Sequence, residues 1–229
     1  MDTLDQRPVP QPHSFRLGRA AFLALVAGSG AALFARGSGF AVSVPRINLL
    51  GNEAVNGFTI YTVTYGYPAF NPATYKLTVD GLVKNPFSLT IDDIVRHPAV
   101  NETRFYQCVT GWSVPNANWT GIRLSDLLDR AGPHPAAHAV KFYSFDGVYT
   151  ESLTMEQARH PDVLLAYKLD HKPLARSQGA PLRLVVPGMY GYKFIKWVNR
   201  VELITAPIDG YWEQNGYDRD AYIGHSNGL

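Results

Sequence analysis

Cys108 is the only cysteine in this 229-residue chain, and its thiol could take part in several kinds of chemistry. It lies in the stretch Gln107–Ser113, which reads QCVTGWS. A single thiol cannot form an internal disulfide, so its special roles are those of a free thiol, a nucleophile or a metal ligand. A thiolate is a soft ligand that suits thiophilic metals. The alternative is a small buried side chain that only fills space, because cysteine is among the most buried residue types.

The composition narrows the classes of protein to consider. Hydrophobic residues make up 46% and charged residues 17% of the chain, which is typical of a globular protein. The net charge of +2 gives no indication of nucleic-acid binding. One cysteine and seven scattered histidines offer no paired zinc-ligand spacing. The sequence also contains no Cys-x-x-Cys-His haem attachment motif and no glycine-rich phosphate loop.

The first 43 residues differ in character from the rest. A polar, proline-containing stretch precedes Arg16 and Arg19, and an apolar stretch follows at residues 20–35. Its length of about 16 residues is shorter than the ~20 of a typical membrane span and is typical of a signal-peptide core. We expect residues 1–43 to be a signal peptide or membrane-anchor leader, and residues 44–229 to be one domain outside the cytoplasm. A buried helix at the start of the domain is the remaining alternative.

Many strands and a few short helices are expected after the leader. Thr90 and Thr154 have the residue type of helix N-caps, and Gly132 follows the predicted helix 124–131 as a stop signal. Alternating or β-branched runs predict strands at 59–65, 75–83, 102–109, 139–145, 182–187 and 197–204. The run 163–167 is compatible with either type of element. Strands and helices do not alternate regularly along the chain as they do in βαβ folds, so we predict an α+β, sheet-rich domain with short helices.

Several ordered motifs together resemble the sulfite oxidase superfamily of molybdopterin-dependent oxidoreductases. The resemblance covers roughly residues 70 to 220 and includes bacterial single-domain members such as the catalytic subunit of periplasmic methionine sulfoxide reductase. The motifs that carry it are QCVTGWS (107–113), WTG (119–121), LLAY (164–167), GAPLRLVVP (179–187), YGYKFIKW (190–197) and GYWE (210–213).

The resemblance implies a site for molybdenum and molybdopterin. Cys108 would be the protein thiolate on the metal, beside the dithiolene sulfurs of the pterin. Arg183 would bind the pterin or the substrate anion, because a guanidinium forks onto oxyanions with two parallel hydrogen bonds. Lys193 follows a glycine-rich turn and is a further candidate phosphate contact. The remaining predicted cofactor contacts are Ser144, Gln178, Phe194, Ile195 and Lys196, and aromatic residues Tyr106, Trp112, Trp119 and Tyr190 are expected to line the approach.

The implied activity is oxygen-atom transfer at a small sulfur-containing or other oxo substrate. Electrons would be exchanged with a separate cytochrome or membrane haem protein, in a periplasmic or other extracytoplasmic location, with or without membrane anchoring. The segment Thr62–Pro68 departs from the family pattern because it lacks an asparagine that relatives use near the pterin.

Two other functions fit the residues. Cys108 could be the nucleophile of a cysteine hydrolase or acyltransferase, which requires a histidine base within reach. His97, His134, His138, His160 and His171 are the candidates, and none lies in a recognisable motif. Alternatively, the chain could be an exported binding domain on the same scaffold without a cofactor, because a fold does not guarantee a function.

Overall fold

The computed structural model describes residues 54–224. The predicted leader at 1–43 lies outside this range, so its role and the domain boundary at residue 44 stay predictions. Within residues 54–224, no helix is both long and apolar enough to cross a membrane.

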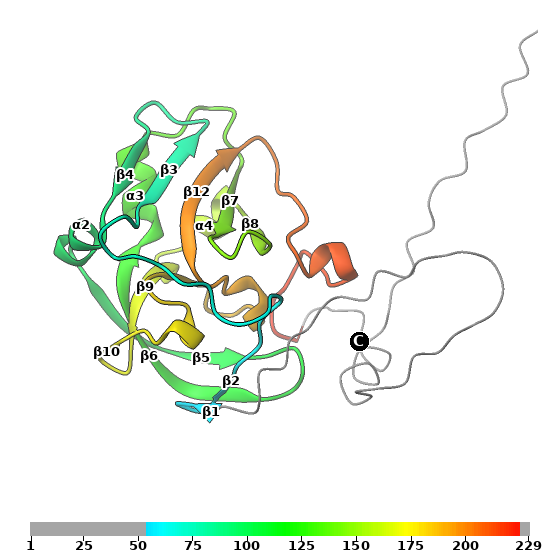
Figure 1. The fold of residues 1–229 in the computed structure, drawn as a ribbon. Helices are drawn as coiled ribbons and strands as arrows, with labels where there is room; N and C mark the ends of the chain where they lie inside the picture. Colours follow the sequence, from blue (N-terminus) through cyan, green and yellow to red (C-terminus); the bar gives the residue numbers. More distant parts are fainter. Residues whose placement is uncertain (1–53, 225–229) are drawn as a thin grey trace, which may run out of the picture.

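Two β-sheets form the body of the described chain (Figure 1). The first sheet has the order β10-β9-β6-β5, and β11 pairs with β9 beside β10. It is antiparallel throughout and curves along the lower side of Figure 1. Its strands are β5 (Val100–Gln107), β6 (Ser113–Arg123), β9 (Leu164–Leu169), β10 (Lys172–Pro173) and β11 (Arg183–Val185).

The second sheet has the order β4-β3-β12-β7-β8. Its only parallel pair among the described strands joins β3 to β12, with Val79 opposite Val201. The strands are β3 (Leu77–Gly81), β4 (Phe87–Leu89), β7 (Ala139–Ser144), β8 (Thr150–Thr154) and β12 (Val198–Ile204). A small separate ribbon pairs β1 (Ala54–Val55) with β2 (Phe58–Thr59).

The α-helices are short, and each begins or ends at a signal in the sequence. The Thr90 hydroxyl accepts a hydrogen bond from the Asp93 amide at the start of α2 (Ile91–Arg96). Thr154 caps α4 (Met155–Ala158) in the same way. The α3 helix (Leu124–Ala131) ends at Gly132, which adopts the left-handed conformation with φ 63°. Three short 3-10 helices follow: η1 (Arg176–Gln178), η2 (Gly191–Lys193) and η3 (Glu213–Asn215).

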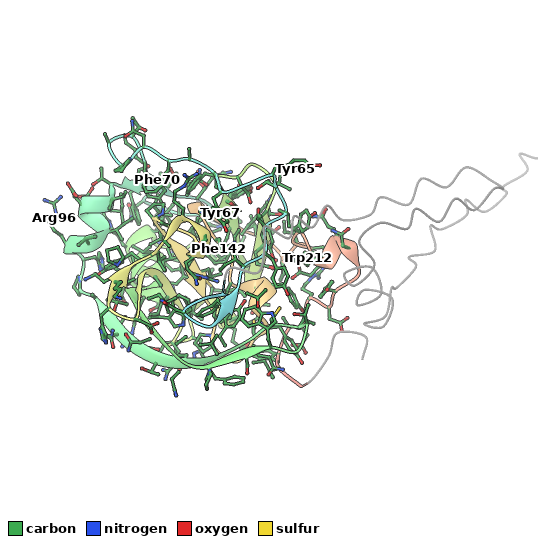
Figure 2. All side chains as sticks on the ribbon, turned by 60° about the horizontal axis from the view of Figure 1, so that its bottom comes forward. Tyr65, Tyr67, Phe70, Arg96, Phe142 and Trp212 are labelled. Atoms are coloured by element: carbon green, nitrogen blue, oxygen red, sulfur yellow. The ribbon has the colours of Figure 1, made fainter. Side chains whose placement is uncertain are left out.

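The core lies between the two sheets and under α3. Phe142 and Val201 of the second sheet and Trp119 and Leu165 of the first are all fully buried. Figure 2 shows Phe142 near the centre of the molecule and Arg96 of α2 at its edge. Burying these aliphatic and aromatic side chains is the main favourable contribution to folding, at about 25 cal/mol per Å² of apolar surface.

The predicted α+β class is confirmed, and most predicted elements are present. The ambiguous run 163–167 is a strand, because β9 pairs with β6 on one edge and with β11 on the other. The predicted strand 59–65 is wrong. Only Phe58–Thr59 is extended, and the Thr62 hydroxyl then accepts from the Thr64 amide in an irregular turn. The sequence analysis also missed β6, whose Pro115 and Gly121 break the usual strand pattern.

Gly121 allows β6 and β9 to approach more closely than any side chain would. A Cβ atom at this position would lie 2.3 Å from the Leu165 carbonyl oxygen. We therefore expect Gly121→Ala to lower the free energy of unfolding by about 3 kcal/mol, because backbone rather than a flexible side chain must move. Urea denaturation followed by circular dichroism measures this.

Gly147→Ala is the control for that substitution. A Cβ atom there meets no atom within 4 Å, so only the strain of its positive φ remains, at about 1 kcal/mol. Equal losses in the two variants would contradict the close-approach argument.

Candidate functional site: a cavity with one thiol and two cations

A single cavity brings together most of the predicted site residues. It encloses about 970 Å³ of empty space, its open mouth included, at the upper end of the roughly 300–1,000 Å³ usual for cofactor sites. Five parts of the chain form its walls: the 58–63 segment, the end of β5, the β7–β8 turn, the stretch from η1 to β12, and the C-terminal segment. Figure 2 shows Trp212 of that C-terminal segment at the side of the molecule where the red ribbon begins.

Cys108 lies directly after β5 and faces the cavity. Its amide donates to the Trp112 carbonyl and its carbonyl accepts from the Gly111 amide, so a tight turn fixes the thiol. The Thr110 hydroxyl donates to Sγ at 3.2 Å. Burial raises the pKa of the Cys108 thiol, which is 8% exposed. A thiol in such surroundings is not a strong nucleophile, whereas a bound metal ion would deprotonate it.

Arg183 on β11 places a buried guanidinium on the same cavity. One terminal nitrogen donates to the Gln178 carbonyl at 3.0 Å, and the other donates to the Phe194 carbonyl at 3.2 Å. The guanidinium lies 5.0 Å from the ring centre of Trp119. Its Nε is buried and has no hydrogen-bond partner among the described residues. Burial lowers the pKa of Arg183 to about 10, so the group stays charged at neutral pH.

Lys196 is the second cation on the cavity wall. Its ammonium donates to the Tyr61 carbonyl at 2.7 Å and to the Ser177 carbonyl at 3.2 Å. Burial, and then the positive charge of Arg183, lower its pKa to about 7. Within residues 54–224, neither Arg183 nor Lys196 forms an ion pair with a carboxylate.

The structure therefore brings Cys108, Gln178, Arg183, Phe194, Ile195 and Lys196 to one cavity, as predicted. It does not bring Ser144 there. The Ser144 hydroxyl accepts from the Asp146 amide at 3.1 Å and thus serves the turn between β7 and β8, while Asp146 itself lines the cavity. Lys193 does not line the cavity either, and its ammonium donates to the carboxylates of Glu151 and Glu213.

The aromatic lining differs from the predicted one. Tyr106 lines the cavity, whereas Trp112, Trp119 and Tyr190 are not among the described lining residues. Trp119 is fully buried beneath the Arg183 guanidinium. The sequence analysis missed the lining residues Tyr61, Tyr149, Tyr192, Trp212 and Tyr217. The tandem aromatic residues of the C-terminal segment were the one signal that could have indicated some of them.

Comparison with known proteins gives the family. A model described as "Oxidoreductase molybdopterin binding domain" matches residues 64–212, which is most of the described chain. The chain belongs to this family. It is an oxidoreductase domain, and its cofactor is molybdopterin.

Relatives of this molybdopterin domain carry several names. Sulfite oxidase of Arabidopsis thaliana is 34% identical over 178 residues, covering 63% of this chain and 45% of that protein. Protein-methionine-sulfoxide reductase catalytic subunit MsrP of Gluconobacter oxydans is 34% identical over 176 residues, covering 69% and 56%. The chain thus spans about half of the length of these two relatives. Uncharacterized oxidoreductase YuiH of Bacillus subtilis is 34% identical over 143 residues, covering 62% and 72%.

A solved structure supports the fold of the molybdopterin domain. The sulfane dehydrogenase SoxCD from Paracoccus pantotrophus superposes with a TM-score of 0.61 at 24% identity. The match covers 81% of this chain and 58% of that chain. The sheet-rich, sulfite-oxidase-like fold predicted from the sequence is therefore confirmed.

The residues on the cavity fit molybdopterin. The phosphate of the pterin is an anion, and the buried Arg183 has an unused Nε donor and no carboxylate partner among the described residues. A buried cation of this kind is costly unless an anion pairs with it. Cys108 supplies one soft ligand, and residues 54–224 contain no group of three or more metal-binding side chains. This donor set suits a metal that an organic dithiolene also holds.

The described walls of the cavity carry no imidazole beside the thiol. The cysteine hydrolase alternative requires a histidine base within hydrogen-bond reach of Sγ. The residue that does reach Sγ is Thr110, through its hydroxyl. Together with the raised pKa of the thiol, this arrangement favours the metal ligand over the nucleophile.

The lowered pKa of Lys196 predicts how the cofactor-free protein responds to pH. The folded pKa is about 7 and the unfolded value is 10.5, so between these values the unfolded chain binds more protons. The free energy of unfolding should therefore rise with pH in this window, by about 3 kcal/mol between pH 7 and 9.5. Lys196→Met should lack this part of the rise. Urea denaturation of both proteins across the window measures it, and parallel pH curves would contradict the assignment.

Proposed function

We propose that this domain catalyses oxygen-atom transfer at a small sulfur-containing or other oxo substrate. The observation that carries the proposal is the joint placement on one cavity of the Cys108 thiol, the buried Arg183 and the half-buried Lys196, neither of which pairs with a carboxylate among the described residues. Cys108 would ligate molybdenum, and Arg183 with Lys196 would hold the phosphate end of the pterin. The names of the relatives, sulfite oxidase and protein-methionine-sulfoxide reductase, are consistent with chemistry at sulfur.

The chain's own residues would bind and orient rather than react. The Gln178 and Phe194 carbonyls fix the orientation of the Arg183 guanidinium. Its Nε–H could therefore donate to an anion without a change of side-chain rotamer. Lys196 would gain a proton as an anion approaches, because a nearby negative charge raises a lysine pKa. When bound, the molybdenum centre supplies the two-electron chemistry X=O + 2H⁺ + 2e⁻ ⇌ X + H₂O. The tyrosine-rich walls would exclude bulk water from this reaction.

The electron balance of this reaction requires a redox partner. Two electrons must arrive or leave each time an oxygen atom moves, and we propose a cytochrome or membrane haem protein as the other party. We also propose an extracytoplasmic location, on the basis of the apolar stretch 20–35 flanked by Arg16, Arg19 and Arg36.

Cys108→Ser tests the metal ligand. A serine hydroxyl is harder and less acidic than a thiol, so we expect turnover to fall at least about 100-fold while the fold is kept. Metal and pterin analysis of the purified proteins, with circular dichroism, gives the comparison. Normal turnover in the serine variant, or a wild-type protein without molybdenum after expression in cofactor-competent cells, would refute the proposal.

Arg183→Lys tests whether Arg183 binds the phosphate of the pterin. Lysine keeps the charge but cannot donate to two carbonyls and a phosphate from one planar group. We expect pterin affinity to fall about tenfold, measured as the pterin fluorescence retained after dialysis. Arg200→Lys is the matched control, because Arg200 lies on β12 in an ion pair with Asp80 and does not line the cavity. Equal pterin retention in both variants would contradict the role of Arg183.

A further inference from the structure

Trp197 adopts a backbone conformation that a bulky side chain rarely takes. Its φ of 58° lies in the left-handed region, at the bend between the cavity-lining stretch and β12. The other non-glycine residues of positive φ in residues 54–224 are Asn56, Asp170 and His171, which lie in tight turns and are of types that tolerate this region. A left-handed tryptophan is strained, and such strain persists only where the surrounding structure enforces it.

Three neighbouring segments enforce the conformation of Trp197. The indole Nε1 donates to the Arg176 carbonyl in η1 at 2.8 Å. The Trp197 carbonyl accepts from the Phe145 amide, directly after β7, at 2.9 Å, and the Trp197 amide donates to the Gly179 carbonyl at 3.4 Å. The side chain is 2% exposed. Hydrogen bonds from both the ring and the backbone therefore hold this residue in the left-handed region.

The Trp197 ring contacts the charge of Lys196, the preceding residue. The Lys196 ammonium lies 4.3 Å from the centre of the indole ring while it donates to the carbonyls of Tyr61 and Ser177. A cation over an aromatic face is stabilised by the electrons of the ring. Gly179 leaves room for the lysine stem, since a Cβ atom at Gly179 would lie 3.0 Å from the Lys196 Cβ. The ring and the glycine together limit where the half-buried Lys196 side chain can lie.

The backbone of Trp197 sets the direction in which Lys196 leaves β12. The next residue, Val198, pairs with Ser144 of β7, and its amide donates to the Leu182 carbonyl at 2.9 Å. Left-handed and right-handed helical φ values differ by roughly 120°. Because β12 is held by pairing with both β3 and β7, an ordinary φ at Trp197 would displace Lys196 and not the strand.

A role in core packing alone does not account for these features. Packing explains why the ring of Trp197 is buried, as it does for other apolar side chains of the core. It requires neither a positive φ nor a ring face turned towards the Lys196 ammonium. Strained residues of this kind cluster at functional sites, and Trp197 lines the cavity.

We propose that Trp197 is a positioning residue for Lys196: its left-handed backbone directs the lysine into the cavity, and its indole ring supports the ammonium where the phosphate of the pterin would bind. This inference rests on the proposed function, which assigns Lys196 to that phosphate. The ring stabilises the positive charge without neutralising it, so the charge stays available to an anion. Trp197 acts through Lys196 and has no need to touch the reacting atoms.

Trp197→Leu in the molybdopterin-loaded enzyme tests the ring. Leucine keeps an apolar side chain but offers no aromatic face, so pterin fluorescence should be lost from the protein about fivefold faster during dialysis. Trp197→Phe keeps a ring, and its rate of loss should stay within about twofold of the wild type. Equal rates in the leucine and phenylalanine variants would overturn the role of the ring.

Phe142→Leu is the matched control for a general loss of stability. It removes a fully buried aromatic ring of the second sheet that is not among the described lining residues of the cavity. We expect its rate of pterin loss to equal that of the wild type. Pterin loss as fast as in Trp197→Leu would overturn the inference.

A double-mutant cycle separates positioning from a merely structural role. In the Lys196→Met background, Trp197→Leu should not accelerate pterin loss further, because the side chain through which Trp197 acts is gone. Independent, multiplicative effects of the two substitutions would overturn the inference. The smaller effect of Trp197→Phe must vanish in the same background, and this comparison stands even where Trp197→Leu does not fold.

The same cycle in the cofactor-free protein distinguishes this inference from the proposed function. At about pH 6 the Lys196 ammonium, whose pKa is about 7, is charged, so Trp197→Leu should lower the urea midpoint more in the wild type than in the Lys196→Met background. Equal shifts would overturn the contact between ring and ammonium. A wild-type protein without pterin, after expression in cofactor-competent cells, refutes the proposed function. A pterin-loaded protein with independent effects leaves that function intact and refutes only the role of Trp197.

Discussion

The burial of the Arg183 guanidinium is the constraint on which the arrangement of the site depends. Removing a charge from water costs free energy. For Arg183, hydrogen bonds to two backbone carbonyls and the contact with the Trp119 ring offset part of that desolvation cost. Those carbonyls belong to Gln178 and Phe194, so the 3-10 turn η1 and the residues after η2 must stay close to β11. The strand, both turns and the tryptophan of β6 are thereby fixed together around a group whose remaining donor is available to an anion.

The basic residues on and near the cavity differ in whether a carboxylate neutralises their charge. Arg183 and Lys196 rest on neutral carbonyls and leave their charge available to a ligand, whereas Lys193 is neutralised by two glutamates. The division also fixes the C-terminal segment, because Glu213 reaches Lys193 from η3 and so holds its neighbour Trp212 on the cavity wall. Lys193 of the structural ion triad with Glu151 and Glu213, and Lys196 of the proposed ligand-binding pair, therefore lie within four residues of each other in the sequence.

Local signals allowed the helices and most strands to be predicted, since Thr90, Thr154 and Gly132 act within one turn of their own position. The cavity residues were identified through ordered motifs and not through spacing. Lys193 and Lys196 look equivalent in sequence, and only the glutamates 42 and 20 positions away from Lys193 distinguish them. The 59–65 segment has the alternation of a strand, but most of it lines the cavity in an irregular turn, in which the Thr62 hydroxyl bonds to the hydroxyl and the amide of Thr64. The ion pairs of Lys193 with residues so distant in sequence leave no local trace.

The parallel pairing of β3 with β12 has a consequence for biogenesis. It joins Thr78 to Arg200, positions separated by most of the described chain, and the cavity takes residues from Phe58 to Tyr217. Contacts of such high sequence separation form late and slowly, because loop-closure entropy must be overcome first. No ribosome-bound fragment that stops before the C-terminal segment contains the complete pocket. A cofactor that needs the whole pocket can therefore reach its full set of contacts only after the C-terminal segment has been synthesised.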